Sequence, residues 1–278
     1  MAAALGTTSV LGVADLAHDT HSIVVEKIEI RLRRLPSALD GLRIAQLSDF
    51  HYDHYFDSYA IRAAVRRTNE LRPDVVVLTG DYVSKGWSKP REINAAHNAE
   101  ICSRLLSDLQ PRLETFAVLG NHDFYTDPEF VSRALRSCGI RVLRNESAPV
   151  EQNGARLWFA GVDDVVAGSA DLRKTLRGLP ESEPRILLVH EPDYADWVPR
   201  DATDLQLSGH SHGGQIVFPI VGPLYLPPLA RKYPWGLRRL AGLTLYTNRG
   251  VGTIGIPARW NCPPEVTLFT LRSAETPA

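Results

Sequence analysis

The chain has 278 residues, of which 44% are hydrophobic and 23% are charged, with 31 Lys and Arg against 32 Asp and Glu. This composition excludes a disordered chain and a collagen-like chain, and three cysteines are too few for a disulfide scaffold. The near-zero net charge excludes a global field that attracts nucleic acid, so an acidic ligand must be bound by a local site. A chain of this length also buries enough surface to fold without a structural metal.

Residues 1–23 are predicted to form a leader ahead of the folded domain. The text MAAALGTTSVLGVADLA is mildly apolar, is shorter than the ~20 residues that span a bilayer, and has no basic region before it. Two interpretations stay open: a flexible leader, or the apolar half of an anchor or twin-arginine signal whose basic front is missing. The second implies export. Otherwise we expect a cytoplasmic protein or one peripheral to the bacterial inner membrane.

From Val24 onward, apolar residues alternate with charged ones, which predicts a half-exposed strand at the start of the domain. Buried strands and helices then alternate along the chain, which predicts a layered α/β fold with much parallel sheet. The predicted strands are Leu42–Leu47, Asp74–Thr79 and Phe116–Leu119, and the predicted helices are Tyr59–Leu71, Glu92–Leu109 and Pro128–Ser137.

After Cys138 the pattern changes to short strands with tight turns, and Asn153-Gly154 between two apolar runs predicts a hairpin. We assign these strands to a second sheet that packs face to face with the first, with one helix near Ala170–Leu176. The strands are Ala148–Gln152, Arg156–Val162, Arg185–Val189, Asp204–Leu207, Gln215–Phe218, Leu243–Tyr246 and Glu265–Leu271. The predicted fold class is therefore α/β, a two-sheet β-sandwich flanked by helices, in a single domain over residues 24–278.

Polar residues follow directly after five of the predicted strands. They are Asp49 and His51; Asp81; Asn121, His122 and Asp123; His190; and His210 and His212. Ligands bind beyond the carboxyl ends of strands in α/β sheets, so we expect these side chains to converge. A set of Asp, Asn and His without Cys suits Mn, Fe, Zn or Ni. The set is too large for one ion, so we expect two ions that share a carboxylate.

These motifs resemble, in order and spacing, those of the calcineurin-like metallophosphoesterases. The matching text is Asp49-x-His51, Gly80-Asp81, Gly120-Asn121-His122-Asp123, His190 and Gly209-His210-x-His212. The resemblance implies that family's four-layer architecture. The C-terminal text around Asn248–Gly252 and Cys262–Glu265 is similar to the bacterial membrane-associated phosphodiesterase branch. Members of the wider family act on UDP-2,3-diacylglucosamine, a precursor in lipid A biosynthesis.

The resemblance implies two divalent metal ions, with Mn as the expected metal, in two ligand sets that share Asp81. One set is Asp49, His51, Asp81 and His212, and the other is Asp81, Asn121, His190 and His210. It further implies that His122 faces the scissile phosphate and that Asp123 fixes the orientation of His122. The implied enzyme is a metal-dependent phosphoric ester hydrolase that cleaves phosphodiester or pyrophosphate bonds by attack of a hydroxide bridging the ions.

The implied substrate is a phosphorylated small molecule or a lipid-linked nucleotide sugar. The sequence leaves two alternative functions. A metal-free scaffold on the same fold would need ligand losses that the sequence does not show. A nucleic-acid phosphodiesterase is disfavoured by the neutral charge balance, so no nucleic-acid partner is expected. No pattern in the sequence indicates an oligomeric state.

The segment Val217–Leu240 is rich in Pro, Leu and aromatic residues, with basic residues interleaved. Two interpretations stay open. The segment either makes peripheral contact with an anionic membrane and admits an acyl chain, or it forms a proline-stiffened lid on the sheet. The basic residues concerned are Arg231, Lys232, Arg238 and Arg239.

Overall fold

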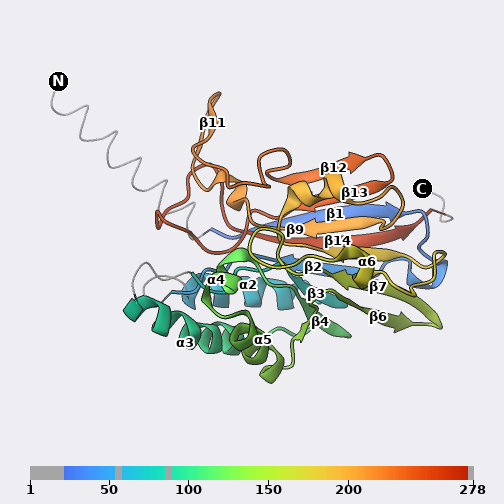
Figure 1. The fold of residues 1–278 in the computed structure, drawn as a ribbon. Helices are drawn as coiled ribbons and strands as arrows, with labels where there is room; N and C mark the ends of the chain where they lie inside the picture. Colours follow the sequence, from blue (N-terminus) through green and yellow to red (C-terminus); the bar gives the residue numbers. More distant parts are fainter. Residues whose placement is uncertain (1–21, 54–57, 85–88, 275–278) are drawn as a thin grey trace.

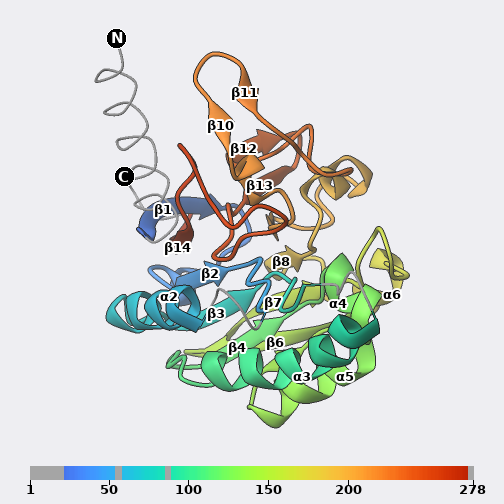
Figure 2. The same ribbon diagram turned by 90° about the vertical axis from the view of Figure 1, so that its left-hand side faces the viewer.

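The computed structural model describes residues 22–53, 58–84 and 89–274 (Figure 1). The predicted leader lies outside the described residues except for its last two, Ser22 and Ile23. Two six-stranded sheets pack against each other, and helices cover the outer face of the first sheet (Figure 2). The prediction of an α/β fold with two facing sheets flanked by helices is therefore confirmed. No helix in the described part of the chain combines the length and apolarity needed to cross a membrane.

The first sheet is built around four adjacent parallel strands. Its order is β1 (Val24–Leu32), β14 (Glu265–Ser273), β2 (Arg43–Leu47), β3 (Val75–Leu78), β4 (Glu114–Ala117) and β5 (Arg141–Val142). Strands β2 to β5 are parallel, and β14 runs antiparallel to β2 and parallel to β1. Because β2, β3 and β4 are parallel, their carboxyl ends meet at one edge of the sheet.

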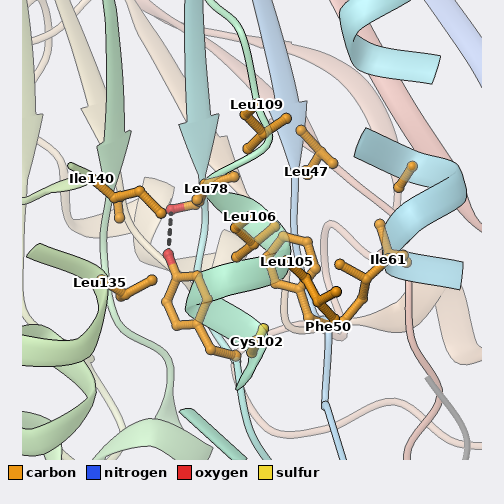
Figure 3. Close-up of a cluster of buried hydrophobic side chains, with 14 of the residues drawn as sticks. Leu47, Phe50, Ile61, Leu78, Cys102, Leu105, Leu106, Leu109, Leu135 and Ile140 are labelled. Atoms are coloured by element: carbon orange, nitrogen blue, oxygen red, sulfur yellow. Dashed lines mark hydrogen bonds between the residues drawn. The ribbon is translucent and has the colours of Figure 1, made fainter. Parts of the chain in front are cut away.

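Helices pack on the outer face of this sheet and form one of the hydrophobic cores (Figure 3). The helices are α2 (Ser58–Glu70), α3 (Lys89–Leu106) and α5 (Pro128–Ser137). Ile61 of α2, Leu105 of α3 and Leu135 of α5 are buried in the same cluster as Leu47 and Leu78 of the sheet. Helix α5 begins where expected, because the Asp127 side chain accepts from Phe130 N at 2.9 Å and Pro128 takes the first position.

The second sheet has the order β12 (Gly236–Leu240), β13 (Leu243–Thr247), β9 (Leu205–Ser208), β8 (Arg185–Leu188), β7 (Ala155–Gly161) and β6 (Glu146–Gln152). The predicted hairpin at Asn153-Gly154 joins β6 to β7, and both turn residues have positive φ, as a type I′ turn requires. Among the residues that the structure describes, the elements on the outer face of this sheet are short. They include α6 (Leu172–Thr175) and the 3-10 helix η2 (Pro192–Trp197).

A second hydrophobic core lies between the two sheets and packs them against each other. Phe116 of the first sheet stacks on Phe159 of the second with ring centroids 4.6 Å apart. Near the carboxyl ends, the buried Gln46 side chain donates to Ser208 O at 2.9 Å and to Thr79 Oγ1 at 3.1 Å. This contact between the sheets brings the ends of β2, β3 and β9 together.

Two strand assignments from the sequence are wrong. Glu265–Leu271 belongs to the first sheet, between β1 and β2, because long-range pairing decides the sheet of a strand that is buried on both faces. Gln215–Phe218 does not join the second sheet. Its last two residues form β10 (Val217–Phe218), which pairs with β11 (Gly222–Pro223) in a separate hairpin. Pro219 and Pro223 have no N–H to extend a ladder.

Some elements of the structure were not predicted. They are the strands β5, β11 and β12, the helix α4 (Asn121–Thr126) and the 3-10 turns η1 (Ser37–Leu39), η2 and η3 (His212–Gly214). Helix α4 begins within one of the predicted motifs, and η3 begins at the end of another. The chain thus turns sharply where the candidate ligands lie.

Candidate metal centre

The structure brings all the predicted site residues together at one edge of the molecule, where the carboxyl ends of the parallel strands of both sheets meet. Asp49, Asp81 and Asn121 follow β2, β3 and β4, while His190 and His210 follow β8 and β9. All of the predicted residues are buried except His122, which is half-buried. Three overlapping groups have ligand atoms within 4.8 Å of one another. They are Asp49, His51 and His212; His51, Asp81 and His122; and Asp81, His190 and His210.

In the first group, the nitrogens of two imidazoles point at each other. His51 Nε2 and His212 Nε2 are 2.9 Å apart, and Asp49 Oδ1 lies 3.4 Å from His212 Nε2. Both oxygens of Asp49 also accept from His210 N, at 3.0 and 3.1 Å, which ties the loop after β9 to the end of β2. One carboxylate and two imidazoles therefore converge on one point.

Asp81 lies between this group and the next. Its Oδ2 is 3.4 Å from His51 Nε2 and 3.1 Å from His190 Nε2, while its Oδ1 accepts from His122 N at 2.9 Å. The rings of His190 and His210 meet with centroids 4.9 Å apart. Among the candidate ligands, Asp81 belongs to two of the three groups and connects the first set of histidines to the second.

In two of the histidines, a hydrogen bond to a backbone carbonyl determines which ring nitrogen can bind a metal. His190 Nδ1 lies 2.6 Å from Thr79 O, and His210 Nε2 lies 2.9 Å from Pro228 O. A carbonyl oxygen only accepts, so these nitrogens carry a proton, and the opposite nitrogens, His190 Nε2 and His210 Nδ1, are the ones that can bind a cation. This arrangement is typical of histidines that bind metals.

Two buried polar atoms at the centre have no hydrogen-bond partner among the described residues. They are His190 Nε2 and Asn121 Oδ1. His190 Nε2 lies 3.1 Å from Asp81 Oδ2, an ion-pair contact. Leaving such atoms unpaired is costly unless another group binds them. Two orphaned electron-pair donors beside buried carboxylates fit a cation, so the residues present fit divalent metal ions with nitrogen and oxygen ligands.

Burial also sets the charge of the candidate ligands. It lowers the pKa of His51 and of His210 to about 3 and that of His212 below its usual range, so these imidazoles are neutral, the form that binds metals. Burial raises the pKa of Asp49 to about 6. Burial alone would raise the pKa of Asp81, but the charges of His190, His122 and His51 together lower it. Burial alone would lower the pKa of His190, but without a bound cation Asp81 and Asp49 raise it.

The backbone is strained at the same residues. Five of the candidate ligands have positive φ, which is uncommon for residues other than glycine. They are Asp49 (53°), His51 (45°), Asp81 (56°), His210 (68°) and His212 (52°). Gly80 has φ 100°, and a Cβ there would lie 2.7 Å from His190 Nδ1. Strain of this kind is concentrated where function requires a fixed geometry.

Helix α4 positions the remaining predicted residues. The half-buried His122 ring packs edge-on to His51, with centroids 4.8 Å apart. The Asp123 carboxylate accepts from the backbone N–H groups of Gly120, Asp81 and Tyr82, each at 2.9 Å. Asp123 therefore holds the loops after β3 and β4 together at the start of α4, the helix that carries His122.

A cavity of about 470 Å³ opens over the centre. Its floor includes His51, Asp81, His122 and His210. Its wall is apolar and comes from two loops, with Leu224, Tyr225, Pro227 and Pro228 on one side and Ile254 and Ile256 on the other. A ligand in this cavity would have one polar end at the candidate ligands and one apolar end at the wall.

Sequence reasoning missed two residues that hold this cavity together. Gln215 accepts from Ile254 N at 2.8 Å and donates to Ile256 O at 2.5 Å. The fully buried Arg259 donates to Gly252 O at 2.6 Å, to Arg249 O at 2.9 Å and to Cys262 O at 3.1 Å. Both lie in loops without any motif, and no local pattern distinguishes them from surface residues.

Replacing Arg259 by Met should lower the free energy of unfolding by roughly 3 kcal/mol or more, because several buried carbonyls lose their donor. Thermal and urea denaturation measure this change. The matched control is Arg239→Met on the exposed face of β12, which should change stability by less than about 0.5 kcal/mol. Equal stability of the two variants would show that Arg259 does not hold these loops.

Residues 42–214 match the family model described as calcineurin-like phosphoesterase. The chain is 34% identical to the uncharacterized metallophosphoesterase YkuE of Bacillus subtilis, over 92% of this chain and 87% of that protein. It is 33% identical to the phosphodiesterase YaeI of Escherichia coli, over 88% of each. A transmembrane protein with metallophosphoesterase domain from Danio rerio is 34% identical over 98% of this chain, which spans only 62% of that relative.

Solved structures share the fold. The NAD nucleotidase of Haemophilus influenzae superposes with a TM-score of 0.53 at 13% identity, over 76% of this chain and 50% of that chain. A dimetal phosphatase from Danio rerio superposes with a TM-score of 0.50 at 14% identity, over 76% of this chain and 88% of that chain. At these identities the likeness concerns the fold alone.

Proposed function

The chain belongs to the calcineurin-like phosphoesterase family and is a phosphoric ester hydrolase, and on that premise we propose that it cleaves phosphodiester or pyrophosphate bonds with two divalent metal ions. The position of Asp81 is the observation that carries this proposal. Its carboxylate contacts histidines of two adjoining groups, as a ligand shared by two ions must do. The bound ions would polarise the phosphoryl oxygens and lower the pKa of a bound water.

We assign the ligands as the family resemblance implies. Asp49, His51, Asp81 and His212 would hold one ion, and Asp81, Asn121, His190 and His210 the other. The orphaned Asn121 Oδ1 and His190 Nε2 support the second set. Mn²⁺ is the metal that we propose, and the same donors suit Fe, Zn and Ni.

We propose that His122 faces the scissile phosphate and donates a proton to the leaving oxygen. Its ring lines the cavity beside His51, and its backbone is fixed by Asp81 Oδ1, so it is well placed to act on a bound ester. Geometry alone would also allow His122 to join His51 and Asp81 around an ion. The two roles differ in their effect on metal content, as described in the Discussion.

The apolar wall supports a finer proposal, that the substrate carries an apolar group next to its phosphate. A lipid-linked nucleotide sugar of the UDP-2,3-diacylglucosamine type meets this description, and its use would bring the protein to the periphery of a membrane. A nucleic-acid substrate is not favoured, because the residues lining the cavity in the described part of the chain include no Lys or Arg. A panel of soluble, acylated and nucleotide diesters would rank these classes by kcat/KM.

Removal of the metals should abolish activity and leave the fold in place. Dialysis against a chelator is expected to reduce hydrolysis of an aryl phosphodiester at least about a hundredfold, since the chain's own residues then lack the ions that polarise the ester. Far-UV circular dichroism should be unchanged, because two extensive hydrophobic cores stabilise the fold without a metal. Added Mn²⁺ should restore the rate. Full activity after chelation would contradict the proposal.

A further inference from the structure

We infer that the tip of the β10–β11 hairpin inserts into the outer layer of a lipid bilayer and holds the mouth of the cavity at the membrane surface. We call residues 216–224 the hairpin. In both views it projects from the body of the molecule on the side of the second sheet (Figures 1 and 2). The inference concerns binding, and only its consequence for the substrate rests on the proposed function.

The tip is apolar and almost fully exposed. The exposed fraction is 108% for Ile220 and 83% for Val221. Leu224 and Tyr225, which follow β11 on the way to the base, are also exposed. Residues 217–230 include no charged side chain, and the Tyr225 hydroxyl is their only polar side-chain group. A contiguous exposed patch of this kind marks an interaction site.

The hairpin is held rigidly at its base. Val217 N donates to Trp260 O at 3.0 Å, and the Phe218 ring meets the Trp260 ring with centroids 5.2 Å apart. Leu224 N donates to Ile216 O at 2.8 Å, which closes the other side. A tip that is already ordered loses little conformational entropy when it binds.

Ile220 has φ 71°, an unfavourable conformation for a β-branched residue, and the folded chain does not bury its side chain. The strained turn directs an apolar side chain into solvent with no gain to the isolated molecule. Burial in hydrocarbon would supply the missing stabilisation.

A bilayer fits this surface better than a protein partner does. The tip has no side chain that could form the polar rim of a protein interface, and Phe218, Tyr225 and Trp260 lie near the base, where aromatic residues meet the lipid headgroups. The basic residues for which the sequence left contact with lipid open, Arg231, Lys232, Arg238 and Arg239, lie outside the hairpin. Lys232 forms an ion pair with Asp196 at 2.8 Å, and Arg238 and Arg239 lie on the edge strand β12. Binding should therefore depend on apolar insertion and not on anionic lipid.

The hairpin continues directly into the wall of the cavity. Ile216 precedes β10 and Leu224 and Tyr225 follow β11, and all three line the cavity above His51 and His210. An apolar surface thus runs from the tip to the metal centre. If the proposed function holds, the substrate is an amphipathic phosphoester whose chain stays at the membrane while its phosphate reaches the centre.

A fluorescent label at the tip tests the inference on the full chain. Ile220→Cys is labelled with an environment-sensitive dye in a Cys138→Ser background, since Cys102 and Cys262 are buried. The control label is at Ser182→Cys, an exposed turn residue before β8 and thus at the opposite edge of the sheet. With phosphatidylcholine vesicles, emission at position 220 should shift to the blue and be quenched by nitroxide lipids. The label at position 182 should not respond.

Sedimentation with the same vesicles gives a second readout. The Ile220→Ser/Val221→Ser double variant should bind the vesicles about a hundredfold more weakly than the wild type, because the loss of each buried apolar side chain weakens binding roughly tenfold. The Arg238→Ser/Arg239→Ser control should bind like wild type. All variants should hydrolyse a soluble aryl diester at the wild-type rate, because none of these residues lines the cavity.

Three results would overturn the inference. The first is a tip label that stays in water when vesicles are present, and the second is equal vesicle binding by the wild type and the Ile220→Ser/Val221→Ser variant. The third is a blue shift without vesicles that grows with protein concentration, which would place another copy of the chain on the tip. If the wild type did not hydrolyse the soluble diester at all, that result would count against the proposed function and not against membrane insertion.

Discussion

Asp81→Asn should retain the fold and lose at least about a thousandfold in kcat/KM for a phosphodiester, together with bound metal. Asp81 contacts His51 and His190 and accepts from His122 N, so it is the carboxylate that we propose both ligand sets share. Asn has nearly the same shape and can keep the bond to His122 N, but it lacks the negative charge that two adjacent cations require. Elemental analysis and steady-state kinetics on the same preparation measure both effects.

The matched control for Asp81→Asn is Asp163→Asn. Asp163 is also a buried carboxylate, but it forms an ion pair with Arg144 at 2.9 Å outside the centre. This control should lower stability, because Arg144 loses one of its two charged partners, and should leave metal content and rate near those of the wild type. An Asp81→Asn enzyme with full metal content and full activity would show that Asp81 does not bridge two ions.

His122→Ala should lower kcat by roughly 10²- to 10⁴-fold while metal content stays that of the wild type. His122 lines the cavity and is the one half-buried residue among the buried candidates, as expected for a group that meets substrate. Because its proposed role is to protonate the leaving oxygen, the loss should be large for an alkyl leaving group and small for a nitrophenyl leaving group. Kinetics with both esters measure the difference.

Two results would contradict this role. Loss of an ion in His122→Ala would make His122 a ligand with His51 and Asp81, the alternative that the geometry allows. An equal loss for both leaving groups would exclude proton donation. Tyr225→Phe serves as a control for changes elsewhere in the cavity, because it keeps the aromatic wall and should leave the leaving-group dependence unchanged.

The convergence of the candidate ligands could be predicted from the sequence more fully than the pairing of the strands. Each candidate ligand directly follows a buried strand, and strand ends in a parallel sheet converge whatever the exact register, so the convergence of Asp49, Asp81 and His190 could be predicted. The α/β alternation could be predicted for the same reason, because it depends on local periodicity.

Features that depend on distant contacts could not be predicted. β14 joins the first sheet by pairing with β1 and β2, more than 200 positions earlier in the chain, and a strand that is buried on both faces gives no sign of its partners. Asp123 and Arg259 bind backbone groups, and because every residue has these groups, the sequence does not indicate which ones they bind. In the sequence, nothing separates the hairpin from the rest of the basic and apolar segment Val217–Leu240, whereas in the structure its turn separates the apolar tip from the charges.

Titration of the metal-depleted chain with Mn²⁺, with bound metal and hydrolysis followed in the same sample, tests the two-metal proposal most directly. We predict that about two ions bind per chain and that hydrolysis of a phosphodiester appears only as the second site fills. Hydrolysis at the full rate with no ion bound, or with a single ion bound, would contradict it.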